Sequence, residues 1–100
     1  MQSGNHTKIP LLIGFTYLKM GKYKLAECWF KRDLLFYGQN DQSANINIFL
    51  FYFLTKRYDQ ALKYAPKIEK IFRQRRRRGA MGGKVWALWQ RRIATVKAVA

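Results

Sequence analysis

An internal repeat with a period of 35 residues is the feature that most constrains the fold of this chain. Three residues of one segment recur 35 positions later: Tyr17, Tyr23 and Ala26 return as Tyr52, Tyr58 and Ala61. The string GKYKLA contains Tyr23 and Ala26 of the first copy, and the similar string KRYDQA contains Tyr58 and Ala61 of the second. Periods of roughly 20–50 residues are typical of proteins built by stacking one small structural unit. We therefore expect two copies of the same unit in a 100-residue chain.

The first copy predicts two helices, over residues 7–20 and 22–37. Thr7 is a suitable N-cap, and Pro10 is tolerated in a first helical turn. Gly21 separates the two helices, and Gly38 follows the second as its expected C′ residue. Apolar residues recur at steps of three and four along the second helix, which is the pattern of an amphipathic helix.

The second copy predicts helices over residues 41–55 and 57–74. The aromatic run IFLFYFL also fits a β-strand. Its position within the repeat, where the first copy is helical, favours a helix. Pro66 lies inside the last helix and should kink or loosen it, because proline lacks an amide donor and clashes one turn back.

We expect a repeat domain over residues 1–74, followed by a second part over residues 75–100. Gly79, Gly82 and Gly83 predict a flexible link that begins with an arginine run. A fifth helix is expected over residues 84–98, with one apolar side composed of Val85, Leu88, Trp89, Val96 and Val99. The predicted fold is therefore all-α, with two antiparallel helical hairpins and a basic C-terminal segment.

The repeat resembles the tetratricopeptide repeat over roughly residues 9–72. The matching residues of the first copy are Ile13, Gly14, Tyr17, Gly21, Tyr23, Ala26 and Phe30, and those of the second are Tyr52, Tyr58 and Ala61. In that family small residues let paired helices approach and large residues fill the spaces between them. The chain departs from the motif at Asp33, where the family prefers a small residue. The resemblance implies a surface that binds peptides or proteins and has no catalytic activity.

Charge points to an anionic partner. Twenty Lys and Arg stand against five acidic residues, which gives a net charge of +15. Such a chain attracts polyanions, and nucleic acid ranks ahead of an acidic protein or an anionic membrane surface. No acidic residue follows Glu69. The residues that we expect to contact an anion are Arg73, Arg75, Arg76, Arg77, Arg78, Lys84, Arg91 and Arg92.

Two tryptophans of the C-terminal segment have two alternative roles. Trp86 and Trp89 precede Arg91 and Arg92, so they could stack on bases beside phosphate-binding arginines. They could instead cover the open end of the helical stack, which a two-repeat solenoid needs. The sequence slightly favours the covering role.

The residue inventory gives no sign of an enzyme. Cys28 and His6 are the only cysteine and histidine, so neither a disulfide nor a His/Cys metal site is expected. No paired carboxylates, nucleophile–base pair or glycine-rich phosphate loop is present. We expect no catalytic residue, no cofactor, no metal and no small-molecule substrate.

The expected function is that of a non-catalytic structural or adaptor subunit. Its repeats would dock on protein, and its basic segment would bind an anion, first of all RNA in a ribonucleoprotein such as a ribosome. The alternative is a small chaperone or co-chaperone of the tetratricopeptide type, as in bacterial secretion systems, which binds a helical client. A peripheral membrane protein is a third reading. The longest apolar run is too short to span a bilayer, and the first ten residues lack a leader-peptide pattern. An already processed chain would also lack that pattern. We expect an intracellular protein, of the cytoplasm or of an organelle matrix.

Overall fold

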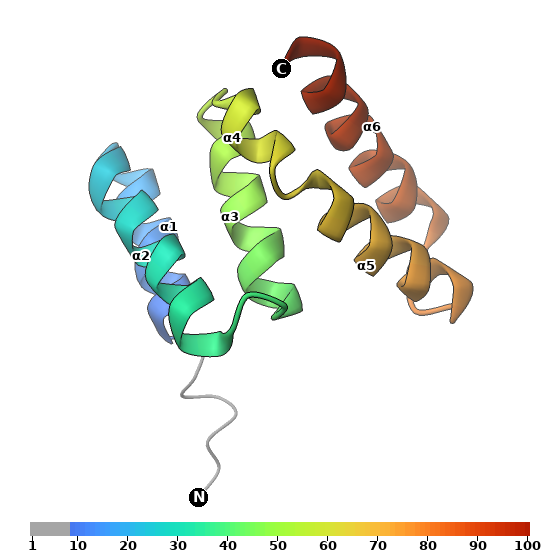
Figure 1. The fold of residues 1–100 in the computed structure, drawn as a ribbon, viewed down its shortest axis with the longest axis horizontal. Helices are drawn as coiled ribbons and strands as arrows, with labels where there is room; N and C mark the ends of the chain where they lie inside the picture. The colour runs from blue at the N-terminus through green and yellow to red at the C-terminus, as the bar shows by residue number, and fades with distance from the viewer. Residues whose placement is uncertain (1–8) are drawn as a thin grey trace, which may run out of the picture. The chain divides into compact units, whose positions relative to one another are not determined.

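The computed structural model describes the backbone of residues 9–100 and the side chains of residues 13–100. Its helices are α1 (Ile9–Lys19), α2 (Tyr23–Tyr37), α3 (Gln42–Leu54), α4 (Tyr58–Leu62), α5 (Ala65–Arg77) and α6 (Gly83–Val99) (Figure 1). No strand occurs between residues 9 and 100, so the prediction of an all-α fold is confirmed. The aromatic run that also fitted a strand lies in α3. The expected cap at Thr7 lies outside the described residues.

The chain divides into two compact units, one ending at Phe51 and the other covering Tyr52–Ala100. The boundary lies within α3, whereas the sequence suggested a division after Gln74. The reason is that α6 packs against α4 and α5 rather than standing apart from them. The basic C-terminal helix thus shares a unit with the last helices of the repeat.

The helical hairpin of α1 and α2 forms the first part of the N-terminal unit. Gly14 packs against the ring of Phe30, which is 1% exposed. Phe30 also meets Phe15 edge to face, with ring centroids 4.9 Å apart, and lies 5.3 Å from the ring of Phe51 in α3. The absence of a side chain at Gly14 lets the two helices approach closely enough to enclose this aromatic ring.

The start of α3 is fixed by a side-chain cap. Asp41 Oδ2 accepts a hydrogen bond of 2.9 Å from the Ala44 amide, which satisfies one of the free donors of the first turn. Asn45, which is 1% exposed, donates from Nδ2 to the carbonyls of Gln39 and Asp41. The buried apolar residues of α3 in this unit are Ala44, Ile48, Phe49 and Phe51.

The backbone repeats at the 35-residue offset where each first helix of a copy ends. Gly21 has a φ of +75° and Lys56 a φ of +60°, both in the left-handed region. The Lys22 amide donates to the Tyr17 carbonyl at 2.9 Å, and the Arg57 amide donates to the Tyr52 carbonyl at 2.8 Å. Both bonds are typical of a helix that ends at a residue in the left-handed conformation, which is usually glycine. That residue is Gly21 in the first copy and Lys56 in the second.

The residues predicted to pack the repeat differ in burial. Ala26, Phe30, Tyr52 and Ala61 are buried, with exposures of 0–1%. Tyr17 and Tyr58 are half-buried. Tyr23 is 52% exposed, so its ring contributes less to the hairpin interface than predicted. At the equivalent position of the second copy, the Tyr58 ring lies 5.8 Å from Phe53 and is partly covered by it.

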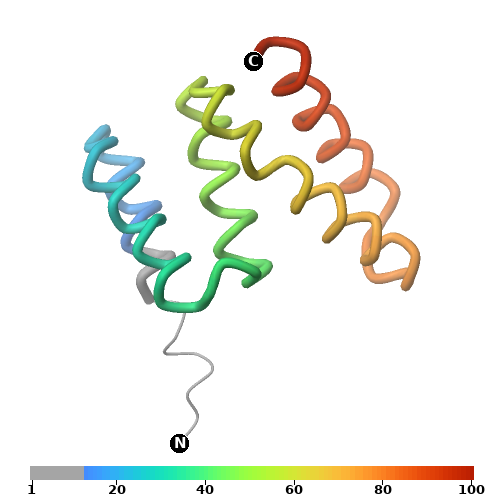
Figure 2. Tube along the Cα trace, viewed as in Figure 1, coloured from blue at the N-terminus to red at the C-terminus, as the bar shows by residue number. Residues whose placement is uncertain are grey.

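The predicted single helix over residues 57–74 is wrong: it consists of α4 and α5, separated by Lys63 and Tyr64 (Figure 2). Pro66 lies in the first turn of α5. In one continuous helix its ring would clash with the carbonyl of Leu62, which is the last residue of α4. The chain therefore breaks one turn earlier than Pro66 itself. The α5 helix also continues beyond Gln74, to Arg77.

The last helix, α6, runs back antiparallel to α5 and packs against both α4 and α5 (Figure 1). Its buried residues are Trp89, Ile93 and Val96. The expected apolar side is thus partly wrong, because Val85, Leu88 and Val99 are 47%, 37% and 62% exposed. Helical spacing allowed more than one stripe, and packing against α4 and α5 selected the stripe that includes Ile93.

Candidate nucleic-acid interface

The arginine run lies at the C-terminal end of α5, not in a flexible link. Arg75, Arg76 and Arg77 form its last turn, and Arg78 is its C-cap. Cations are favoured there because the free carbonyls of a helix end carry a partial negative charge. The chain turns at Gly79, with φ of +74°, and α6 begins four residues later. We call Arg75–Gly82, which joins the two helices, the arginine turn.

The four arginines of the run have different surroundings. Arg75 is half-buried, with its guanidinium 5.5 Å from the ring centre of Phe72. Arg76 Nη1 donates to the carbonyl of Met81 at 3.3 Å, which holds the turn together. Arg77 and Arg78 are exposed, and neither side chain has a hydrogen bond, ion pair or ring contact with the described part of the chain, although the Arg78 amide donates to the Gln74 carbonyl at 3.1 Å. Two of the four are thus left for an external anion.

The other predicted anion contacts also separate into two groups. Arg73, Lys84 and Arg91 are exposed. Arg92 instead packs inward, with its guanidinium 4.6 Å from the Trp89 ring centre and 6.0 Å from that of Phe53. Desolvation by burial lowers the pKa of Arg92, although an arginine stays charged at neutral pH. Arg92 therefore supports the packing of α6.

The C-terminal unit offers the arginines little negative charge. Its acidic residues are Asp59 and Glu69. Glu69 Oε2 already accepts a hydrogen bond of 2.9 Å from Lys97 Nζ. Asp59 lies in the first turn of α4. Ten of the twenty Lys and Arg residues follow Glu69 without any acid among them, so this stretch repels itself unless an anion binds.

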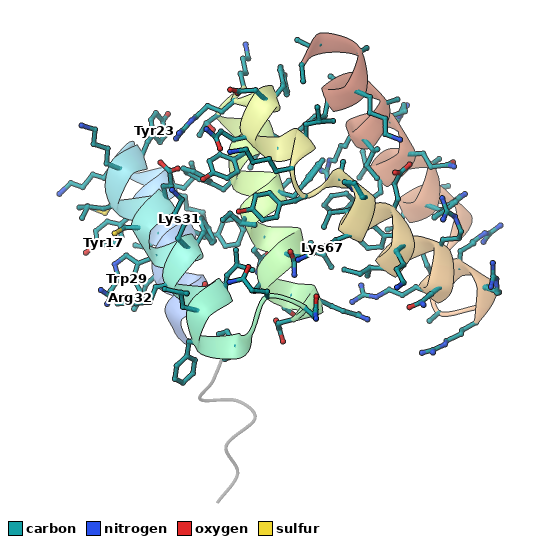
Figure 3. The ribbon with its side chains drawn as sticks, viewed as in Figure 1. Tyr17, Tyr23, Trp29, Lys31, Arg32 and Lys67 are labelled. Atoms are coloured by element: carbon teal, nitrogen blue, oxygen red, sulfur yellow. The ribbon has the colours of Figure 1, made fainter. Side chains whose placement is uncertain are left out.

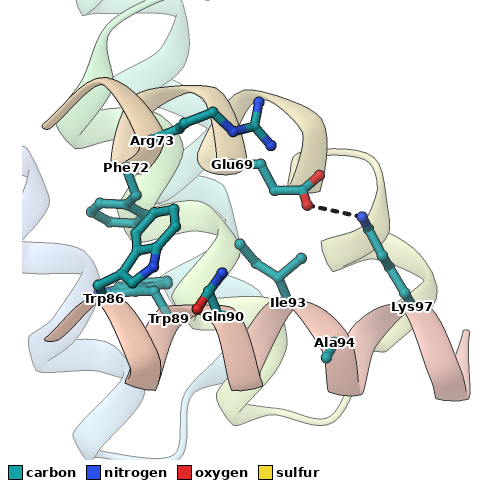
Figure 4. A pocket seen from close by; sticks show the side chains of 9 residues that line it. All are labelled: Glu69, Phe72, Arg73, Trp86, Trp89, Gln90, Ile93, Ala94 and Lys97. Atoms are coloured by element: carbon teal, nitrogen blue, oxygen red, sulfur yellow. Dashed lines mark hydrogen bonds and ion pairs between the residues drawn. The ribbon is translucent and has the colours of Figure 1, made fainter. Parts of the chain in front are cut away.

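A groove of about 230 Å³ lies between α5 and α6. Phe72, Trp86 and Trp89 gather at one end, and the Glu69–Lys97 ion pair closes the other (Figure 4). Arg73 lines the groove from α5, and Gln90 lines it from α6 (Figure 4). Aromatic surface and polar side chains therefore share one small concave site.

Trp86 and Trp89, for which the sequence predicted the same two alternative roles, have different surroundings in the structure. Trp89 is 8% exposed and lies between Phe72, whose ring centroid is 4.6 Å away, and the guanidinium of Arg92. Trp86 is half-buried, lines the groove, and makes no ring or cation contact with another described residue. Trp89 thus holds α6 against α5, while part of the Trp86 surface stays accessible.

A second exposed feature, which sequence reasoning missed, is an apolar stripe on α2. Leu25, Leu35 and Phe36 are 46%, 79% and 68% exposed, and Cys28 between them is exposed as well. The Arg32 guanidinium lies 4.7 Å from the Trp29 ring centre on the same side of the helix (Figure 3). We call Leu25, Cys28, Trp29, Arg32, Leu35 and Phe36 the α2 stripe. The sequence signal for this stripe was its spacing of three and four residues. That spacing gives α2 a second apolar face, in addition to the one that its hairpin with α1 buries.

Within residues 9–100, no three His, Cys, Asp or Glu side chains come together in a group that could hold a metal ion. His6 lies outside the described residues. No helix in the described part of the chain combines the length and the apolar character needed to cross a membrane.

Comparison of the chain with protein-family models, with curated proteins and with solved structures finds no match. We therefore infer the function from the geometry and charge of the arginine turn and the α2 stripe.

Proposed function

We propose that this protein is a non-catalytic adaptor subunit that binds single-stranded RNA through the arginine turn and a protein partner through its helical hairpins. The observation that carries the proposal is the exposure of Arg77 and Arg78 without a partner in the described chain. A ribonucleoprotein such as a ribosome is the kind of assembly that uses both surfaces.

The helix end explains only part of the arginine run. The C-terminus of a helix carries the equivalent of about half a negative charge, and four guanidinium groups lie at or beside that end of α5. Since no acid follows Glu69, the excess positive charge faces solvent. Guanidinium groups match phosphate oxygens in geometry as well as charge, and binding also releases counterions. RNA phosphates therefore fit the arginine turn better than a single carboxylate does.

The protein-binding part of the proposal rests on the α2 stripe. Exposed apolar side chains at helical spacing are suited to the apolar face of a partner helix. Lys24, Lys31 and Arg32 on the same helix are exposed, so a partner helix with acidic flanks has complementary charge. The resemblance of the hairpins to tetratricopeptide repeats supports the same role.

The α2 stripe also supports an alternative function, that of a small helical chaperone for one client protein. The two functions differ in what accompanies the chain in cells. A chaperone forms a stable equimolar complex with one helical client that nuclease does not disturb. An RNA-bound adaptor loses its companions when nuclease is added.

A salt titration tests the RNA-binding function directly. The affinity for a single-stranded oligonucleotide is measured at several salt concentrations for the wild type and for Arg77→Gln/Arg78→Gln. The slope of log affinity against log salt should become less steep by about 1.4, at about 0.7 per lost phosphate contact. The matched control is Lys22→Gln/Lys24→Gln, which removes the same charge from exposed positions of the other unit. Equal slopes for the two double variants would contradict the proposal.

A further inference from the structure

We infer that the groove between α5 and α6 binds one unstacked base of the RNA, with Trp86 as the stacking surface. This inference rests on the proposed RNA-binding function and assigns it a second kind of contact. Phosphate contacts hold a strand without distinguishing bases, whereas aromatic rings add affinity through the base itself.

Trp86 is the residue of the groove suited to stacking. The faces of Trp89 are already occupied by Phe72 and Arg92, at 4.6 Å each. Trp86 lies beside these residues but makes no ring or cation contact with a described residue, and it is half-buried, so its ring is held but still accessible. Its place at the start of α6, beside the arginine turn, brings the aromatic surface close along the chain to the phosphate-binding residues.

The size of the groove favours a single ring system. Its volume of about 230 Å³ is smaller than the roughly 300–1,000 Å³ of sites for drug-sized ligands. A flat base can lie against Trp86 while its ribose and phosphates stay outside. Gln90 has a side-chain amide, which can both donate and accept hydrogen bonds at a base edge.

The charges around the groove indicate where the phosphates of the strand lie. The Glu69–Lys97 ion pair lies at the end away from the aromatic rings, so this end offers a phosphate no net positive charge (Figure 4). Arg73 and Arg77 are one helical turn apart on the same face of α5, a rise of about 6 Å. The phosphates that flank the bound base therefore follow Arg73 and Arg77 toward the arginine turn. An apolar peptide segment would leave these cations unused, which favours RNA as the occupant.

The test compares two single-stranded oligomers of equal length, oligouridylate and an abasic ribose-phosphate strand. The wild type should bind oligouridylate roughly 5- to 150-fold more tightly than the abasic strand. In Trp86→Leu this difference should disappear, while the affinity for the abasic strand and its salt slope stay unchanged. Trp86→Phe keeps an aromatic ring and should retain a reduced preference. Tyr23→Leu, which removes an exposed aromatic ring from the other unit, should retain the full preference.

Each other outcome has a defined meaning. If the wild type binds both strands equally, or if Trp86→Leu weakens both strands equally, the base site is contradicted while the arginine turn remains supported. If the wild type binds neither strand, the proposed RNA-binding function fails as well. If an acidic peptide containing phenylalanine binds in a Trp86-dependent way and the strands show no base preference, the groove is a peptide site and the inference is overturned. Thermal melts of every variant identify any that fails to fold, and in that case Trp86→Phe decides.

Discussion

A Cβ atom placed on Gly14 would lie 2.8 Å from both Cε1 and Cζ of Phe30, closer than real side chains approach. Gly14→Ala should therefore destabilise the protein by about 1–3 kcal/mol through overpacking, although alanine is the better helix former. Urea denaturation measures the change. Gly83→Ala is the control, because nothing lies within 4 Å of a Cβ at that position. If Gly14→Ala is as stable as the wild type, the close approach of α1 and α2 is wrong. Phe30→Leu should restore part of the loss in the double variant.

Lys56 occupies a backbone conformation that its glycine counterpart, Gly21, adopts without strain. Lys56→Gly should stabilise the protein by about 0.5–1 kcal/mol, because a non-glycine residue with φ of +60° is strained. Gly21→Ala should destabilise it by about 1 kcal/mol for the same reason. Lys56→Ala removes the charge but keeps the strain, so it should give no gain. A gain for Lys56→Ala equal to that for Lys56→Gly would assign the effect to charge.

Ala26 and Ala61, which are 35 positions apart, are both 0% exposed. Ala26→Leu and Ala61→Leu should each lower the free energy of unfolding by about 1–3 kcal/mol, because neither site has room for three more carbons. Ala87→Leu is the matched control at an exposed position of α6. Unchanged melting temperatures for both buried variants would show that these alanines do not lie at helix crossings.

The arginines of the run should separate into a structural pair and a binding pair. Arg75→Gln/Arg76→Gln removes the contact with Phe72 and the hydrogen bond to Met81, at a cost of about 1 kcal/mol of stability. Arg77→Gln/Arg78→Gln should leave stability within about 0.5 kcal/mol, as is usual for exposed sites. Chemical denaturation compares the two double variants. Equal losses would mean that the run acts as one charged cluster.

The two tryptophans of α6 should differ in their effect on folding. Trp89→Ala should cost about 3–5 kcal/mol, because it leaves a cavity between Phe72 and Arg92. Trp86→Ala should cost clearly less, since that ring already lies partly in solvent. Thermal melts of both variants give the comparison. A larger loss of stability for Trp86→Ala than for Trp89→Ala would contradict the assignment of Trp89 as the residue that packs α6 against α5.

Local features of the sequence predicted the helices and several of their ends. The 35-residue repeat placed a helix end at Gly21, and the same termination recurs at Lys56, where no glycine indicates it. Pro66 correctly indicated a disturbed helix, but not that the break would fall at Lys63 and Tyr64. The arginine run was recognisable as an anion-binding candidate. Its division into two side chains that contact the protein and two that do not was not recognisable, because that depends on where Phe72 and Met81 lie.

The sequence by itself determined the all-α fold, the repeat and the excess of positive charge, since helix formation, glycine turns and net charge are properties of the local chain. Only the tertiary structure decided which apolar stripes are buried. In α2 the stripe containing Ala26 and Phe30 packs while Leu35 and Phe36 stay exposed, and in α6 Ile93 is chosen over Leu88. Helical periodicity gives every stripe the same spacing, and burial depends on which neighbouring helix covers it.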